Sequence, residues 1–72
     1  MEIRLNIDDE FIRRLQEDLR EGRATEIARE ALGLLRWAVD ERQRNRVILS
    51  ANPDGTNLHR LSMPILEKVA PA

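Results

Sequence analysis

The stretch that decides the fold lies at the N-terminus, where residues 2–8 are EIRLNID. Its side chains alternate strictly between polar and apolar. The polar face carries Glu2, Arg4 and Asn6, and the apolar face carries Ile3, Leu5 and Ile7. This period of two residues predicts a short N-terminal β-strand with one buried face. Because no hairpin partner follows it, the strand must find the edge of another strand for its backbone hydrogen bonds.

A first helix is predicted directly after the strand. Asp8 is a candidate N-cap, and Asp9 and Glu10 bring negative charge to the first turn, where the helix dipole favours it. Apolar residues recur at the helical period from about Asp9 to Arg20, and Gly22 then provides a C-terminal stop. These apolar residues are Phe11, Ile12, Leu15 and Leu19.

A second, longer helix is predicted after Gly22. Thr25 is a candidate cap with Glu26 in the first turn, and the charged run at 40–46 places cations near the C-terminus. The apolar residues form two adjoining stripes, which are too wide for the short first helix to cover, so they indicate a partner chain. They are Ile27, Ala28, Ala31, Leu32, Leu34, Leu35, Ala38 and Val39.

Residues 47–72 are expected to form a C-terminal extension with a β-hairpin. The sequence predicts strands at 47–50 and 56–62. Between them Asn-Pro-Asp-Gly at 52–55 is a strong turn signal, because Pro fixes φ and Gly can adopt a positive φ. A short turn of helix is predicted at 65–69. Trp37, on the second helix, is predicted to be covered by this hairpin through Val47, Ile48 and Leu58, and the alternative is an exposed contact for a partner protein.

Length and composition favour an oligomer. The chain has 72 residues, 12 basic and 13 acidic side chains, one His, no Cys and a net charge of −1. A domain this small buries little apolar surface, and it has neither a disulfide nor the ligands of a zinc site to stabilise it. We therefore expect a dimer or a larger assembly. The balanced charge excludes a uniformly basic nucleic-acid coat, but not a local basic patch.

Membrane and enzymatic functions find no motif. No run approaches the roughly 20 apolar residues of a membrane span, and residues 1–4 lack the apolar region of a signal peptide. Together with the absence of Cys, this predicts a cytoplasmic protein. His59 stands beside Arg60 without a nucleophile at a recognisable spacing, and there is no glycine-rich phosphate loop. We expect no enzymatic activity, no cofactor and no metal, and we interpret His59 as a surface or interface residue.

Two solutions satisfy the unpaired first strand. It joins the C-terminal hairpin as a third strand, or it pairs with the same strand of a second chain. The second solution gives an antiparallel ribbon whose width fits the major groove of B-DNA. There Arg4 can bind guanine, Asn6 adenine, and Glu2 can accept a hydrogen bond from cytosine. An ordinary polar strand face is the alternative interpretation of these side chains.

The order of these elements resembles the ribbon-helix-helix superfamily of the Arc, MetJ and CopG type. The resemblance rests on EIRLNID at 2–8, on Gly22 and on TEIAREAL at 25–32, and it covers about residues 2–45. It implies an intertwined homodimer, alone or in higher assemblies, whose ribbon enters the major groove of double-stranded DNA. Such proteins are commonly bacterial or plasmid repressors, or the antitoxins of toxin–antitoxin pairs.

The resemblance also implies a phosphate contact at the N-terminus of the second helix. The matching positions are Ala24, Thr25 and Glu26, through backbone N–H groups and the Thr25 hydroxyl, with Arg23 adding charge. A helix N-terminus offers free donors and the positive end of the dipole. Glu26 departs from this pattern, because its carboxylate would lie close to the anion unless it pairs with Arg23 or Arg29. On the first helix, cations that could touch phosphates have acidic neighbours, so pairing within the helix is the stronger expectation; these cations are Arg13, Arg14 and Arg20.

We therefore interpret 1–46 as a DNA-binding and dimerisation domain and 47–72 as a hairpin and tail. The leading hypothesis is a sequence-specific transcriptional repressor. One alternative is an antitoxin in which 47–72 bind a protein partner, and another is a structural dimer that binds no nucleic acid. The predicted dimer core consists of Ile3, Leu5, Ile7, Phe11, Leu15, Ile27, Ala31 and Leu35.

Overall fold

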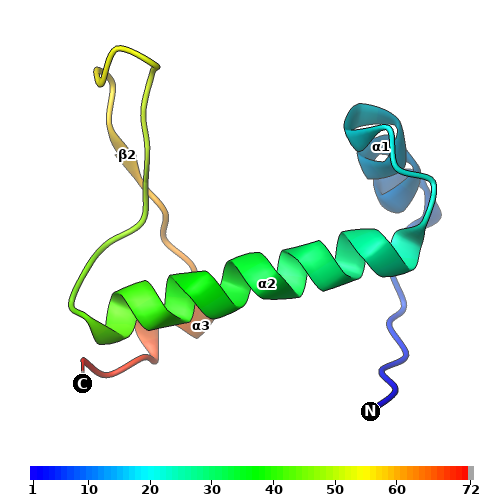
Figure 1. Ribbon diagram of the computed structural model, residues 1–72, viewed down its shortest axis with the longest axis horizontal. Helices are drawn as coiled ribbons and strands as arrows, with labels where there is room; N and C mark the ends of the chain where they lie inside the picture. The colour runs from blue at the N-terminus through cyan, green and yellow to red at the C-terminus, as the bar shows by residue number, and fades with distance from the viewer. Residues whose placement is uncertain (72) are drawn as a thin grey trace. The chain divides into compact units, whose positions relative to one another are not determined.

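The computed structural model describes residues 1–71, which are mainly helical with one small antiparallel sheet. In chain order the elements are α1 (Asp9–Leu19), α2 (Ala24–Gln43), β1 (Leu49–Ser50), β2 (His59–Arg60) and α3 (Pro64–Glu67) (Figure 1). The two helices, the hairpin and the short C-terminal helix expected from the sequence are confirmed. The chain divides within α2 into two compact units, Met1–Leu32 and Gly33–Ala72.

The N-terminal strand expected over residues 2–7 is not formed. Residues 1–8 have no regular secondary structure, and within residues 1–71 the sheet consists of β1 and β2 alone. The prediction is therefore wrong for the single chain, and so is the alternative in which this strand joins the hairpin. The physical reason is that a strand needs a neighbouring backbone to take its hydrogen bonds, and the described chain supplies none.

The start of α1 agrees with the sequence. Asp8 is the N-cap, and its carboxylate accepts a hydrogen bond of 3.1 Å from the backbone N–H of Phe11. Asp9 and Glu10 lie in the first turn, where negative charge complements the helix dipole.

The end of α1 differs from the prediction, because Arg20 and not Gly22 stops the helix. Arg20 adopts the left-handed conformation with φ 54° and ψ 38°. Its N–H donates to the carbonyl of Glu17 at 3.2 Å, and the N–H of Glu21 donates to the carbonyl of Gln16 at 3.0 Å. These two bonds make a Schellman ending, which satisfies carbonyls that the helix leaves free. Gly22 contributes its carbonyl, which accepts a bond of 3.0 Å from the Gln16 side chain.

The start of α2 is also shifted relative to the sequence prediction. The Arg23 carbonyl accepts hydrogen bonds from the N–H groups of Glu26 at 3.1 Å and Ile27 at 3.2 Å. Arg23 therefore occupies the cap position, and Thr25 lies inside the first turn of the helix. The prediction that Thr25 caps α2 is wrong.

The end of α2 repeats the ending of α1 with a better-suited residue. Asn45 takes the left-handed position with φ 62°. Its N–H donates to the carbonyl of Arg42 at 3.0 Å, and the N–H of Arg46 donates to the carbonyl of Glu41 at 3.0 Å. Asn tolerates this conformation better than most residues, because its short polar side chain can form local hydrogen bonds.

The hairpin turn matches its prediction. The N–H of Gly55 donates to the carbonyl of Asn52 at 2.8 Å, and Gly55 has φ 85°. The N–H of Asn52 donates to the carbonyl of Thr56 at 2.9 Å. The strands are shorter than expected, with Leu49 opposite Arg60 and Ser50 opposite His59. Asn57, with φ 57°, interrupts the extended backbone before β2 begins.

Few apolar side chains are buried. Among the described residues, Ile27 is the buried apolar residue of Met1–Leu32, and Ala38 and Leu66 are those of 33–71. In the second unit, α3 brings Glu67 to 4.0 Å from the guanidinium of Arg42 on α2. Trp37 remains 50% exposed and Leu58 remains 62% exposed, so the prediction that the hairpin covers Trp37 is wrong.

Candidate nucleic-acid interface

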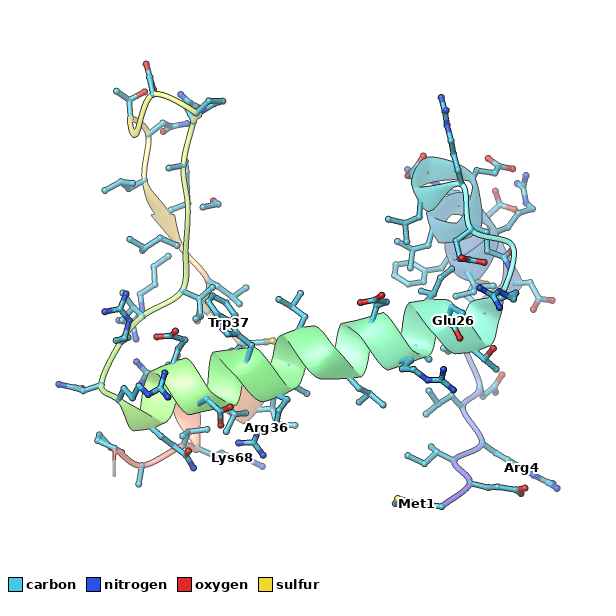
Figure 2. All side chains as sticks on the ribbon, viewed as in Figure 1. Met1, Arg4, Glu26, Arg36, Trp37 and Lys68 are labelled. Carbon is cyan, nitrogen blue, oxygen red and sulfur yellow. The ribbon has the colours of Figure 1, made fainter. Side chains whose placement is uncertain are left out.

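The predicted base-contacting side chains lie on the irregular N-terminal segment. Glu2, Arg4 and Asn6 are all exposed and form no hydrogen bond or ion pair within residues 1–71. Figure 2 shows the Arg4 side chain extending away from this segment. In the single chain these donors and acceptors are accessible, but no regular strand fixes their spacing.

The N-terminus of α2 offers two free donors. The backbone N–H groups of Ala24 and Thr25 have no acceptor among the described residues, and they lie at the positive end of the helix dipole. The Glu26 carboxylate (Figure 2) is drawn aside by Arg29, whose guanidinium nitrogen lies 3.0 Å from it. Pairing with Arg29 is one of the two arrangements that keep this acidic side chain compatible with a bound phosphate.

Glu21 is a participant that the sequence analysis missed. Its carboxylate accepts a hydrogen bond of 3.0 Å from the backbone N–H of Arg23 and lies 3.3 Å from Arg23 Nε. The carboxylate therefore already binds the Arg23 N–H and lies beside its guanidinium at the start of α2. A phosphate bound there would compete with Glu21 for these donors. An acidic residue just ahead of a helix start is the sequence signal that could have indicated this contact.

The cations of α1 fall into two groups. Arg13 pairs with Glu10 and lies 2.9 Å from Glu17, which confirms pairing within the helix. The hydrogen bond with Glu10 is the main cause that raises the pKa of Arg13. The expectation of pairing within the helix is wrong for Arg14 and Arg20, which form no ion pair within residues 1–71. They and Arg4 are the exposed cations of Met1–Leu32 whose charge is not already balanced by a neighbour.

Three further observations concern metal-ligating side chains, His59 and membrane-spanning helices. Within residues 1–71 no group of three or more His, Cys, Asp or Glu side chains is placed to hold a metal ion. His59 is exposed, and its Nε2 lies 3.1 Å from the side-chain oxygen of Asn57. No helix in the described part of the chain is both long and apolar enough to cross a membrane.

Most of the predicted dimer core is exposed in the single chain. Ile27 is buried, and Leu15 and Leu35 are partly buried. The remaining predicted core residues are exposed, and they are Ile3, Leu5, Ile7, Phe11 and Ala31. These side chains are therefore left uncovered by the described residues of the single chain.

Comparison with protein-family models, with curated proteins and with solved structures finds no match to this chain. The functional argument therefore rests on the chain's own residues and geometry.

Proposed function

We propose that this chain is a sequence-specific DNA-binding transcriptional repressor that acts as a homodimer. Residues 2–7 of two copies pair as an antiparallel ribbon, and the ribbon enters the major groove of double-stranded DNA. The observation that carries the proposal is the N-terminal segment itself, which combines strict alternation with exposed side chains on both faces and pairs with no strand within residues 1–71.

The exposed apolar face of this segment argues for a second copy. Ile3 is 57% exposed, Leu5 is 66% exposed, and Phe11 on α1 is 59% exposed. Fully burying an exposed side chain of this size contributes about 1.5–3 kcal/mol, and about half of that is available to side chains that are already half-covered. A symmetric ribbon doubles every such contact, and it satisfies the backbone of both strands at once.

The polar face supplies the proposed recognition of bases. In a ribbon the side chains of Glu2, Arg4 and Asn6 from both copies point away from the helices. Arg4 contacts guanine through two hydrogen bonds, and Asn6 contacts adenine in the same way. Each such pair discriminates against a wrong base by about 1–3 kcal/mol.

Phosphate contacts orient the dimer on the duplex. The free N–H groups of Ala24 and Thr25 are the proposed anchor, with Arg23 beside them. Arg14 on α1 and Arg20 directly after it add cations. Because acidic residues outnumber basic ones in Met1–Leu32, we expect weaker non-specific binding to DNA than a basic repressor shows.

The test selects bound fragments from a random DNA library and compares wild type with Arg4→Ala and Asn6→Ala. We expect each variant to lose preference at one position of the selected site, because base contacts specify sequence. The matched control is Arg44→Ala, which removes an exposed arginine that also forms no ion pair within residues 1–71. If Arg4→Ala and Asn6→Ala select the same site as wild type, the ribbon does not contact the bases.

A second candidate function is an antitoxin in which residues 47–72 bind a protein. The observation that favours it is the exposed apolar surface beyond α2, where Leu58 is 62% and Ile65 54% exposed. The double variant Leu58→Ser and Ile65→Ser separates the two functions. A DNA-binding repressor keeps its affinity for the selected site, whereas an antitoxin loses the protein that it neutralises.

A further inference from the structure

The outer edge of β1 leaves backbone groups free. The N–H of Leu61 donates to the carbonyl of Ile48 at 2.8 Å, so these two residues form a hydrogen-bonded pair of the antiparallel ladder. Leu49 and Arg60, the next pair, are therefore not hydrogen-bonded to each other. The N–H and C=O of Leu49 point away from β2, and within residues 1–71 they have no partner.

This edge lacks the features that usually protect a strand from pairing. Exposed edges are commonly protected by charged side chains or proline. The stretch 47–52 is Val-Ile-Leu-Ser-Ala-Asn and carries no charge, and Pro53 comes only at its end. The opposite edge, along β2, carries Arg60. Val47 is 44% exposed and Leu49 is 50% exposed, so the uncharged edge also presents apolar side chains.

We propose that a second copy of this chain pairs with the outer edge of β1. The two β1 strands run antiparallel about a two-fold axis through Leu49, and they form a four-stranded sheet in the order β2-β1-β1-β2. A symmetric pairing places each residue near its own copy, and an uncharged stretch meets no repulsion there. A two-stranded hairpin alone is marginally stable in water, and a sheet of four strands removes this weakness.

The register through Leu49 keeps the most hydrogen bonds. It places Val47 opposite Ala51 of the partner, so that every outward N–H of the stretch has an acceptor. An axis shifted toward Pro53 loses a donor, because proline has no N–H. An axis shifted toward Arg46 brings the two Arg46 side chains together, where like charges repel. The uncharged stretch between these two residues, 47–52, has its centre between Leu49 and Ser50, half a residue from the proposed axis.

This pairing does not rest on the proposed DNA-binding function. It uses residues 47–52, whereas the proposed ribbon uses residues 2–7. The two contacts can join the same pair of chains or link one dimer to the next. Loss of DNA binding would therefore leave the β1 pairing intact, and loss of β1 pairing would leave the N-terminal ribbon intact.

The experiment measures amide exchange by NMR on the full chain at several protein concentrations, with molar mass from light scattering. We expect the Leu49 amide to exchange at least tenfold more slowly than the Arg60 amide, with protection that increases with concentration. A Leu49 amide that exchanges as fast as that of Arg60 at every concentration would overturn the proposal. Protection of the Leu49 amide at concentrations where light scattering gives the mass of a single chain would also overturn it, because the partner would then lie in the same chain.

Two matched variants test the contact itself, both made in a chain that also carries Leu5→Lys, so that the proposed N-terminal ribbon does not hold the copies together. Leu49→Pro removes the outward donor of β1 without removing a hydrogen bond to β2, and Arg60→Pro removes the equivalent donor of β2. We expect Leu49→Pro to weaken self-association at least tenfold and Arg60→Pro to leave it unchanged. Loss of protection of the Ser50 amide would show that Leu49→Pro disrupts the hairpin. In that case Leu49→Lys replaces Leu49→Pro as the test of self-association. It keeps the donor, and it must weaken self-association more strongly at low salt, because it brings two charges together. Unchanged self-association would overturn the proposal, in Leu49→Pro if its hairpin is intact and otherwise in Leu49→Lys.

Discussion

The two units of the molecule contain similar local elements, namely a helix end and a stretch with a strand pattern. Only the second unit provides these elements with a partner strand and a residue suited to the helix end. In Gly33–Ala72 a strand finds its partner through a four-residue turn, and α2 ends on an asparagine suited to the left-handed conformation. In Met1–Leu32 a stretch with a strand pattern has no partner, and α1 ends on an arginine in that strained conformation. The first unit is locally incomplete, and this is the condition expected of a segment that orders on a partner.

We expect the largest difference between the units when one exposed leucine in each is replaced by lysine and the affinity for DNA is measured. Leu5 and Leu58 are similarly exposed in the single chain, at 66% and 62%. Leu5→Lys puts a cation into the proposed ribbon core, where an unpaired charge is costly. We expect it to lower the affinity for the selected DNA site at least 100-fold, or roughly 2.7 kcal/mol. Protection of the backbone amides over residues 2–7 should disappear with it.

Leu58→Lys is the control for this experiment, because Leu58 lies outside the proposed ribbon. Fluorescence anisotropy with labelled duplex and amide exchange by NMR measure both variants. We expect Leu58→Lys to leave the affinity and the protection of residues 2–7 within twofold of wild type. If the two substitutions change the DNA affinity equally, the apolar face of residues 2–7 does not form the proposed contact with a second copy.

The two helix ends allow a smaller and opposite effect. Arg20→Gly relieves a left-handed conformation that costs about 1–2 kcal/mol, less the 0.5–1 kcal/mol that glycine loses in backbone entropy. We expect the free energy of unfolding to rise by about 0.5–1 kcal/mol. Asn45→Gly should change it by less, because asparagine already tolerates its φ of 62°. Urea denaturation followed by circular dichroism measures both.

Arg20→Gly also separates stability from binding. Arg20 forms no ion pair within residues 1–71, so its removal costs no contact there, yet the proposal assigns its charge to a DNA phosphate. The variant should therefore be more stable and bind DNA several-fold more weakly, with a salt dependence reduced by about one counterion. Unchanged binding would remove Arg20 from the interface and leave the stability prediction in place.

Local signals account for what could be predicted from the sequence. The Asp8 cap, the helical period of the apolar residues and Asn-Pro-Asp-Gly each specify a structure through near neighbours, and each is found where it was expected. The N-terminal strand depends on a non-local pairing. Its alternation identifies two faces but does not supply a partner, so the single chain does not form it.

The helix ends and the site show the same limit on a smaller scale. Arg20 stops α1 because backbone bonds from Arg20 and Glu21 close the helix, whatever the side chain at that position. At the other end of this turn, the Glu21 carboxylate binds the Arg23 backbone, and α2 starts ahead of Thr25. The exact residue at which each helix begins or ends depends on which neighbouring backbone and side-chain groups form hydrogen bonds. A pattern of residue propensities does not specify these bonds.

The smallest expected effect concerns the turn that makes the second unit locally complete. The Asp54 carboxylate accepts hydrogen bonds from the Thr56 hydroxyl at 2.6 Å and from the Thr56 N–H at 3.0 Å. These hydrogen bonds hold the pKa of Asp54 below its ordinary value, and the bond from the Thr56 hydroxyl has the larger effect. Because the folded-state pKa is the lower one, the charged carboxylate stabilises the hairpin above the ordinary pKa of about 3.9. This contribution is lost as the pH falls through the lowered value.

Chemical shifts and exchange of the Thr56 and Ser50 amides between neutral pH and pH 2 measure this loss. In wild type we expect the turn to loosen only in the acidic part of this range, and the β1–β2 pairing to weaken with it. Asp54→Asn keeps a side-chain oxygen that can accept the same hydrogen bonds, but it does not titrate, so its turn should be independent of pH. An identical acid response in Asp54→Asn and wild type would assign the loosening to another group. The uncharged contacts of the turn, which include the hydrogen bond of 2.9 Å from the N–H of Asn52 to the carbonyl of Thr56, would then hold it without help from the Asp54 charge.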